Sequence, residues 1–99
     1  MKHAFIITAY KDFELLKDMV TIYTEKFSID CYIHIDRRTK NKTSALSELN
    51  KIPGVTAKSI YITNWGSYKH PLSIIRLMGM AQKKGYDYYH VISANHSLP

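Results

Sequence analysis

The sequence predicts an α/β fold in which helices flank a mainly parallel sheet. Four short runs rich in apolar and β-branched residues alternate with three stretches of helical periodicity, and the connections between them are short. Alternation of this kind is typical of parallel sheets, because each helix returns the chain to the edge from which the next strand starts. A length of 99 residues, of which 45% are hydrophobic, suits one domain with its own core.

The first part of the chain contains two predicted strands and a helix between them. Residues 3–9 form a compact apolar run, typical of a strand that is buried on both faces. Asp12 is a good N-cap for the helix that follows. The apolar positions of that helix recur at helical spacing: Leu15, Leu16, Met19, Val20, Ile22, Tyr23 and Phe27. Residues 29–35 read as the second strand, which ends at Asp36 and is followed by a polar loop.

The second part of the chain repeats the pattern. A short helix is predicted from Thr43 or Ser44 to the Pro53-Gly54 pair, and residues 56–62 are predicted to form the third strand. A loop with the single tryptophan precedes a helix that begins at Pro71. Its predicted inward positions are Leu72, Ile75, Met78 and Ala81. The helix ends at Lys83-Lys84-Gly85, where a glycine can adopt a left-handed conformation, and residues 86–93 form the fourth strand.

Charge and cysteine content restrict the partners and the compartment. Fourteen Lys and Arg against eight Asp and Glu give a net charge of +6, which favours anionic partners such as phosphates, nucleic acid or acidic lipid without choosing among them. Cys31 lies in an apolar run and is expected to be a buried small hydrophobe. The amino-terminal apolar run is too short for a membrane span and does not resemble a signal peptide, so a cytoplasmic location is expected.

Chemically distinctive residues follow the predicted strands at the end where ligands bind in open α/β sheets. These segments are residues 8–10, 36–38, 64–68 and 94–97. Asp36 could accept hydrogen bonds from a ribose hydroxyl or a base edge, or it could be a helix cap or form an ion pair with Arg37 or Arg38. Trp65 could stack on a base, or it could fill the core beneath its loop.

Several chemistries are disfavoured by the motifs. Neither GxGxxG nor GxxxxGK[ST] occurs, which argues against dinucleotide-dependent redox chemistry and P-loop hydrolysis. No DxD pair is present. The five histidines are scattered without metal-ligand spacing, and we predict no metal site from them: His3, His34, His70, His90 and His96.

Four stretches, taken in order, resemble one enzyme family. They are AFIITAY (4–10), YIHIDRRTK (32–40), NWGSYKHPLSIIRLMGMAQKKG (64–85) and YDYYHVIS (86–93). Together they resemble the N-terminal part of the core-2/I-branching β-1,6-N-acetylglucosaminyltransferases, and they cover nearly the whole chain. The resemblance implies that residues 1–99 are the Rossmann-like nucleotide-sugar-binding part of a GT-A type glycosyltransferase, truncated before its catalytic half.

The resemblance also implies a substrate and a reaction. The donor would be a UDP-sugar, UDP-N-acetylglucosamine or UDP-xylose, and transfer to a hydroxyl of a glycan or polysaccharide acceptor would invert the anomeric configuration. No metal or other cofactor and no nucleic-acid partner are expected for this family. A location in the cytoplasm, at the membrane periphery of a bacterium, would follow.

Site residues carry over from the family position by position. Thr8 or Ala9 would line the uracil pocket, Asp36 would bind the uridine, and Trp65 occupies the place of a family aromatic near the base. Arg37, Gly66 and Ser67 belong to the same strand-end segments and complete the predicted substrate-binding set.

Two departures from the family bear on activity. The chain has Tyr10 in place of the usual histidine, and its last seven residues, SANHSLP, replace the family pattern SGQDxP. The family's general base and its basic diphosphate ligands lie downstream of the matching region, so no catalytic residue is assigned here and the chain alone is expected to be inactive. The alternative function is a non-catalytic basic α/β module that binds nucleic acid or assembles oligomers. An exposed sheet edge would favour a homo-oligomer.

Overall fold

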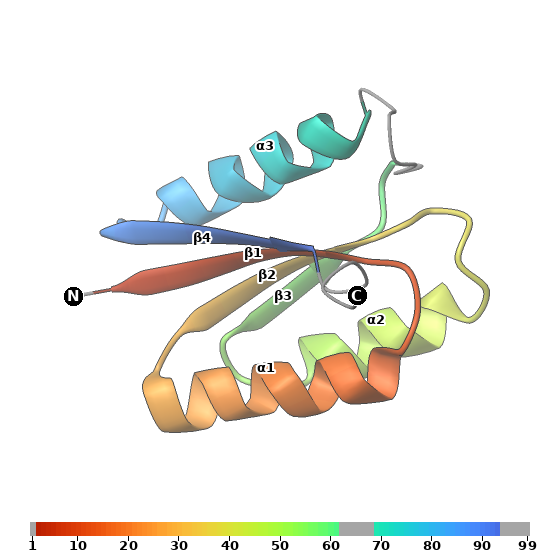
Figure 1. Cartoon of the computed structure of the whole chain (residues 1–99), viewed down its shortest axis with the longest axis horizontal. Coiled ribbons are helices and arrows are strands. Elements are labelled where there is room, and N and C mark those ends of the chain that lie inside the picture. The colour runs from red at the N-terminus through yellow and green to blue at the C-terminus, as the bar shows by residue number, and fades with distance from the viewer. Residues whose placement is uncertain (1, 62–68, 94–99) are drawn as a thin grey trace.

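Among the described residues, four strands form a single sheet in which every neighbouring pair is parallel, in the order β3-β2-β1-β4 (Figure 1). The strands are β1 (His3–Ala9), β2 (Asp30–Ile35), β3 (Val55–Lys58) and β4 (Tyr88–Ser93). The structure is a computed structural model that describes the backbone of residues 2–61 and 69–93 and the side chains of residues 2–61 and 74–92. The predicted α/β class with a parallel sheet is confirmed, and the arrangement is Rossmann-like.

In the part of the chain that the structure describes, three helices cover the two faces of the sheet (Figure 1). Helices α1 (Phe13–Phe27) and α2 (Lys42–Asn50) lie on one face, and α3 (Lys69–Gln82) lies on the other. Successive residues of a strand point to opposite faces, so each strand contributes to both cores. The core beneath α1 and α2 includes Ile7, Ile33, Ile35, Leu16, Val20 and Leu49. The core beneath α3 includes Ala4, Ile6, Tyr32, Leu77, Ala81 and Tyr86.

The inward face of α3 differs from the prediction at one position. Ile75 was expected to face the core, but it is 63% exposed, whereas Leu77 is 1% exposed. The stripe that packs on the sheet is Ile74, Leu77, Met78 and Ala81. Met78 and Ala81 were therefore assigned correctly, and the predicted Leu72 lies outside the described side chains. The sequence is apolar at both Ile74 and Ile75, so periodicity alone does not say which one faces the sheet.

In helix α1 as well, fewer apolar residues face the core than the sequence pattern predicts. Leu16 and Val20 are buried, but Leu15, Ile22 and Phe27, which were assigned to the same stripe, are 60%, 46% and 63% exposed. A helix on one sheet face buries only a stripe of its surface, so this sequence has more apolar positions than the stripe can hold.

The expected capping role of Asp12 is wrong. Asp12 occupies the N-cap position of α1 with φ 56° and ψ 47°, and its side chain makes no capping hydrogen bond. A capping side chain normally requires an extended N-cap backbone, and the left-handed conformation of Asp12 departs from it. The first helical hydrogen bond is instead made by the backbone, from Leu16 N–H to the Asp12 carbonyl at 3.0 Å.

Strand β3 is shorter than predicted because its continuation bonds to a side chain. The prediction extended to residue 62, but the strand ends at Lys58. The N–H groups of Ile60 and Tyr61 donate to Nε2 of His34, at 3.1 and 3.0 Å, instead of continuing the ladder. An apolar run therefore identified the strand but not its end.

The end of α3 follows the prediction. Gly85 has φ +70°, a left-handed conformation that glycine adopts without steric strain. The N–H groups of Lys84 and Gly85 donate to the carbonyls of Ala81 and Gln82, at 2.9 and 3.1 Å. These bonds satisfy carbonyl groups at the helix end, as expected of a C-cap.

The edge of the sheet at β3 is protected by a side chain. The Asn50 side-chain N–H donates to the Ala57 carbonyl at 3.1 Å, and its oxygen accepts the Ala57 N–H at 2.8 Å. The Val55 N–H donates to the Ile52 carbonyl at 3.1 Å. Asn50 thus occupies the place of a neighbouring strand. Occupied backbone groups prevent an edge strand from pairing with another chain.

The opposite edge of the sheet, within the described residues, is β4 (Tyr88–Ser93). Its sequence, YYHVIS, contains no Lys, Arg, Asp, Glu or Pro, and Tyr88 and Val91 are 48% and 54% exposed. Charged residues and proline are the usual means of preventing pairing at an edge. If two copies of the chain associate through an edge, we expect them to use β4.

We expect Asn50→Ala to open the β3 edge. The substitution removes two hydrogen bonds to Ala57, and the free energy of unfolding should fall by about 1–3 kcal/mol. Self-association should rise in sedimentation velocity, because the exposed backbone groups of β3 could then pair. Ser47→Ala, at an exposed position of the same helix, is the control. Equal stability and equal sedimentation of the two variants would contradict the protective role.

Candidate functional site at the carboxyl edge of the sheet

The strand order indicates where a ligand would bind. The chain proceeds outward from β1 through β2 to β3 and then crosses to β4 on the other side of β1. In open parallel sheets, ligands bind outside the carboxyl ends of the strands, next to the point where the order reverses. That point lies between the carboxyl ends of β1 and β4, and the end of β2 lies on the other side of β1. Tyr10 directly follows β1.

A shallow pocket of about 270 Å³ is present at this edge. It is lined by Tyr10, Asp36, Arg38 and Thr39. Tyr10 follows β1, and the other three residues belong to the turn after β2. The two segments are held together by the Asp36 N–H, which donates to the Ala9 carbonyl at 3.1 Å.

Asp36 is the buried acid of this pocket. It is 5% exposed, and its Oδ1 accepts the backbone N–H of Arg38 at 2.8 Å and the Nε–H of the same arginine at 3.5 Å. The first of these bonds is an Asx-turn, in which an aspartate bonds the backbone two residues later. The Thr39 N–H donates to the Asp36 carbonyl at 3.0 Å and closes the turn. Of the interpretations left open by the sequence, the ion pair of Asp36 with Arg38 is present.

Thr39 contributes a hydroxyl group to the same pocket. Its Oγ1 is buried and has no hydrogen-bond partner among the residues that the structure describes. A buried hydroxyl normally has a partner, because leaving it unpaired is unfavourable. A ligand with a polar group that enters the pocket could provide one.

The segment after β3 also reaches this edge. The Arg37 N–H donates to the Tyr61 carbonyl at 2.9 Å, and the rings of Tyr61 and His34 stack with centroids 5.9 Å apart. His34 is 1% exposed, and its Nε2 accepts the N–H groups of Ile60 and Tyr61. Two of the four predicted strand-end regions, residues 8–10 and 36–38, therefore converge, and the other two, residues 64–68 and 94–97, lie outside the described residues.

The predicted site residues differ in burial, and some of them lie outside the described part of the chain. Thr8 and Ala9 are 5% and 3% exposed, and they point to opposite faces of the sheet, with Ala9 in the core beneath α1 and α2. Arg37 is exposed. Asp36 lines the pocket. The remaining predicted residues lie outside the described part of the chain: Trp65, Gly66 and Ser67.

Three pocket residues were absent from the predicted set: Tyr10, Arg38 and Thr39. The sequence contains a signal for Arg38. An aspartate at the end of a strand favours an Asx-turn, which positions the residue two places later. The sequence could not show that Arg38, and not Arg37, would share the pocket with Asp36. The choice between them depends on the turn geometry.

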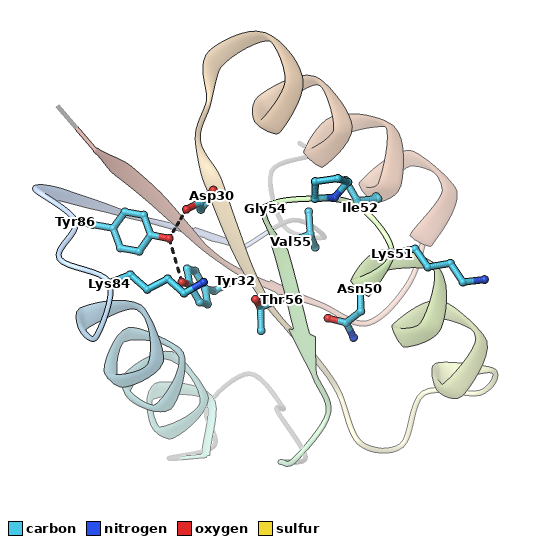
Figure 2. Close-up of a pocket in the computed structure, with 11 residues that line it drawn as sticks. Asp30, Tyr32, Asn50, Lys51, Ile52, Gly54, Val55, Thr56, Lys84 and Tyr86 are labelled. Carbon is cyan, nitrogen blue, oxygen red and sulfur yellow. Dashed lines mark hydrogen bonds between the residues drawn. The ribbon is translucent and has the colours of Figure 1, made fainter.

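A second hollow, of about 360 Å³, lies at the amino ends of β2 and β3 (Figure 2). Tyr86 Oη donates to Asp30 Oδ2, and the hydroxyls of Tyr32 and Tyr86 are 3.1 Å apart. Figure 2 shows Lys84 extending toward these groups and Lys51 pointing away. The two hydroxyls bond to each other, and that of Tyr86 also bonds to Asp30. The hollow lies at the edge opposite to the usual ligand position. We assign it a structural role.

Two side chains close to Asp30, the Cys31 thiol and the Tyr86 hydroxyl, have raised pKa values. Burial, and secondarily the charge of Asp30, raises the pKa of the Cys31 thiol from about 9 to about 12. Burial and the hydrogen bond to Asp30 also raise the pKa of Tyr86. Cys31 is fully buried, which confirms the expectation that it is a small hydrophobe of the core.

We expect the free energy of unfolding to fall as the pH rises above about 9. A native-state pKa that is raised gives a stabilisation that is complete below the unfolded-state pKa and is lost as the pH approaches about 12. The loss from one such group is at most about 1.4 kcal/mol per pH unit. Urea unfolding at pH 8, 9 and 10 measures it. Cys31→Val cannot ionise and should show a shallower decline, and an identical decline would contradict the assignment.

Two further features concern metals and membranes. Among the described residues, no group of three or more His, Cys, Asp or Glu side chains is arranged to hold a metal ion. None of the described helices is long and apolar enough to cross a membrane.

Comparisons of the chain with protein-family models, with curated proteins and with solved structures find no match.

Proposed function

We propose that this chain binds the nucleotide of a UDP-sugar at the carboxyl edge of the sheet. The observation that carries the proposal is the buried carboxylate of Asp36 in an open pocket, at the strand end where the fold places ligands. The ordered resemblance to the core-2/I-branching glycosyltransferases supports the choice of UDP-N-acetylglucosamine or UDP-xylose.

Each pocket residue has a role in this proposal. A carboxylate has about four lone-pair sites, so Asp36 can accept a ribose hydroxyl or a uracil N–H in addition to its bonds with Arg38. Arg38, with a side chain that is 56% exposed, provides positive charge for the diphosphate. Tyr10, 42% exposed, presents a ring on which a base can stack, a contact worth about 1–3 kcal/mol for nucleic-acid bases. Thr39 provides a hydroxyl group.

The proposal assigns donor recognition to this chain, not sugar transfer. Inverting transfer requires a base for the acceptor hydroxyl and charge that stabilises the departing diphosphate. Asp36 is held by Arg38, and a carboxylate in this arrangement suits the acceptance of hydrogen bonds. The transfer itself, to a hydroxyl of a glycan or polysaccharide and without a metal ion, is proposed for an enzyme in which such groups join this domain.

The proposal is tested by titrating UDP into the protein in a calorimeter, with and without EDTA. We expect saturable binding that EDTA leaves unchanged. Asp36→Asn keeps the size of the side chain but removes its charge, and it should weaken binding at least tenfold, about 1.4 kcal/mol. Asp18→Asn, exposed on α1, makes the same charge change away from the pocket and should bind like the wild type.

Two outcomes would overturn the proposal. One is an Asp36→Asn variant that keeps its fold by circular dichroism and binds UDP as tightly as Asp18→Asn. The other is saturable binding of a short oligonucleotide together with no binding of UDP, which would favour the basic nucleic-acid-binding module.

A further inference from the structure

The ring of His34 holds the chain segment that follows β3. The N–H groups of Ile60 and Tyr61 both donate to Nε2 of His34, at 3.1 and 3.0 Å. An imidazole nitrogen accepts a hydrogen bond only when it carries no proton, so the neutral ring has its proton on Nδ1. The fold therefore uses His34 as an acceptor in one defined tautomer.

Burial makes this acceptor sensitive to protonation. His34 is 1% exposed, and the Tyr61 ring stacks on it with centroids 5.9 Å apart. A proton on Nε2 would point an N–H group at the two N–H donors, so both hydrogen bonds would be lost, and it would create a cation away from water. Uptake of that proton therefore requires residues 60 and 61 to move away from the ring.

The groups around the ring favour its neutral form. The strand register places Thr8 of β1 and Lys58 of β3 beside His34, on the face that α3 covers. Lys58 is exposed, and its positive charge opposes a second one on the ring. The nearest acidic side chain along the sequence, Asp36, forms its ion pair with Arg38. The described α3 side chains in the core on this face are apolar: Ile74, Leu77, Met78, Met80 and Ala81.

The segment that His34 holds also supports the turn of the candidate UDP site. The carbonyl of Tyr61 accepts the N–H of Arg37 at 2.9 Å. Arg37 lies between Asp36 and Arg38, which both line the pocket. Movement of Tyr61 away from His34 would therefore remove one of the hydrogen bonds that fix this turn.

We propose that His34 is a pH-sensitive switch: protonation of Nε2 releases residues 60 and 61 and loosens the turn that carries Asp36 and Arg38. The open state binds one proton more than the closed state, so the closed state is favoured above about pH 6.5, where an exposed imidazole titrates, and loses this advantage as the pH falls below it. The effect on ligand binding rests on the proposed UDP site, whereas the release of residues 60 and 61 does not.

Amide hydrogen exchange of the full chain at pH 7.5, 6.5 and 5.5 tests the switch. Protection factors, which correct for the intrinsic pH dependence of exchange, should fall about tenfold at residues 60 and 61 between pH 7.5 and pH 5.5. At pH 5.5 these amides should be less protected than those of the β1–β2 ladder. Unchanged protection at residues 60 and 61, or protection at pH 5.5 equal to that of the ladder, would overturn the proposal.

Two variants separate His34 from other titratable groups. His34→Gln keeps a carbonyl acceptor near the position of Nε2 but takes up no proton in this range, so its protection at residues 60 and 61 should change by less than about twofold. His90→Phe removes an exposed histidine and should respond like the wild type. An equal fall in His34→Gln and the wild type would assign the response to another group and overturn the proposal.

A measurement on the wild type decides the matter if His34→Gln does not fold. The ¹⁵N chemical shifts of the His34 ring at pH 7.5 should show a proton on Nδ1 and none on Nε2. A proton on Nε2 at this pH would mean that the ring does not accept the two backbone N–H groups, and the proposal would fail.

UDP-N-acetylglucosamine tests the link to the candidate site. Both of its phosphates are esterified, so the ligand has no phosphate proton to exchange in this range. At a free concentration 100 times its Kd, it should raise the protection of residues 60 and 61 by up to about 100-fold. Binding without any such increase would overturn the link to the turn. If no UDP-sugar binds, the proposed function fails, and exchange in the free protein still decides whether His34 is a switch.

Discussion

Replacing His34 with phenylalanine should destabilise the protein by about 1–3 kcal/mol. The ring of phenylalanine fills similar space but accepts no hydrogen bond, so the N–H groups of Ile60 and Tyr61 lose their partner. A buried donor left unsatisfied costs about 1–3 kcal/mol, and the two partly buried donors here share the single lone pair of Nε2, so this cost applies about once. Urea unfolding measures the loss.

Hydrogen exchange distinguishes this mechanism from a general packing defect. In the wild type the amides of Ile60 and Tyr61 should exchange slowly, and in His34→Phe they should exchange faster than the amides of the β1–β2 ladder. His90→Phe makes the same substitution at an exposed position and should change stability by less than about 0.5 kcal/mol. Unchanged protection at residues 60 and 61 would show that the His34 bonds do not hold this segment.

Replacing Leu77 with alanine should lower the free energy of unfolding by about 2–5 kcal/mol. Leu77 is 1% exposed and belongs to the core between α3 and the sheet, so the shorter side chain leaves a cavity. Large-to-small substitutions at such positions lose both the burial of the removed atoms and the packing around them. Denaturant unfolding measures the change.

Ile75→Ala is the matched control on the same helix. Ile75 is 63% exposed, so its truncation should alter stability by less than about 0.5 kcal/mol. The pair also decides between the sequence pattern, which placed Ile75 in the core, and the structure, which places Leu77 there. A larger loss for Ile75→Ala than for Leu77→Ala would support the sequence pattern.

The candidate site could be predicted in part. Asp36 was identified because a carboxylate directly after a buried strand stands out, and its position in the pocket depends only on where the strand ends. Tyr10 and Arg38 were missed as site residues, because membership of the pocket depends on the backbone path of two separate turns. The shortening of β3 was missed for a related reason, since the competing acceptor is His34 of another strand.

The sequence by itself determined the element order, the parallel sheet and the burial of Cys31. These features follow from local periodicity and from the short connections, which leave few ways to cover both faces of a sheet. Contacts between distant residues were decided only by the tertiary structure. Asn50 on the β3 edge, Arg38 beside Asp36 and the pairing of His3 with His90 depend on strand register and turn geometry. Register is set by packing across the whole sheet, so no single segment of the sequence encodes it.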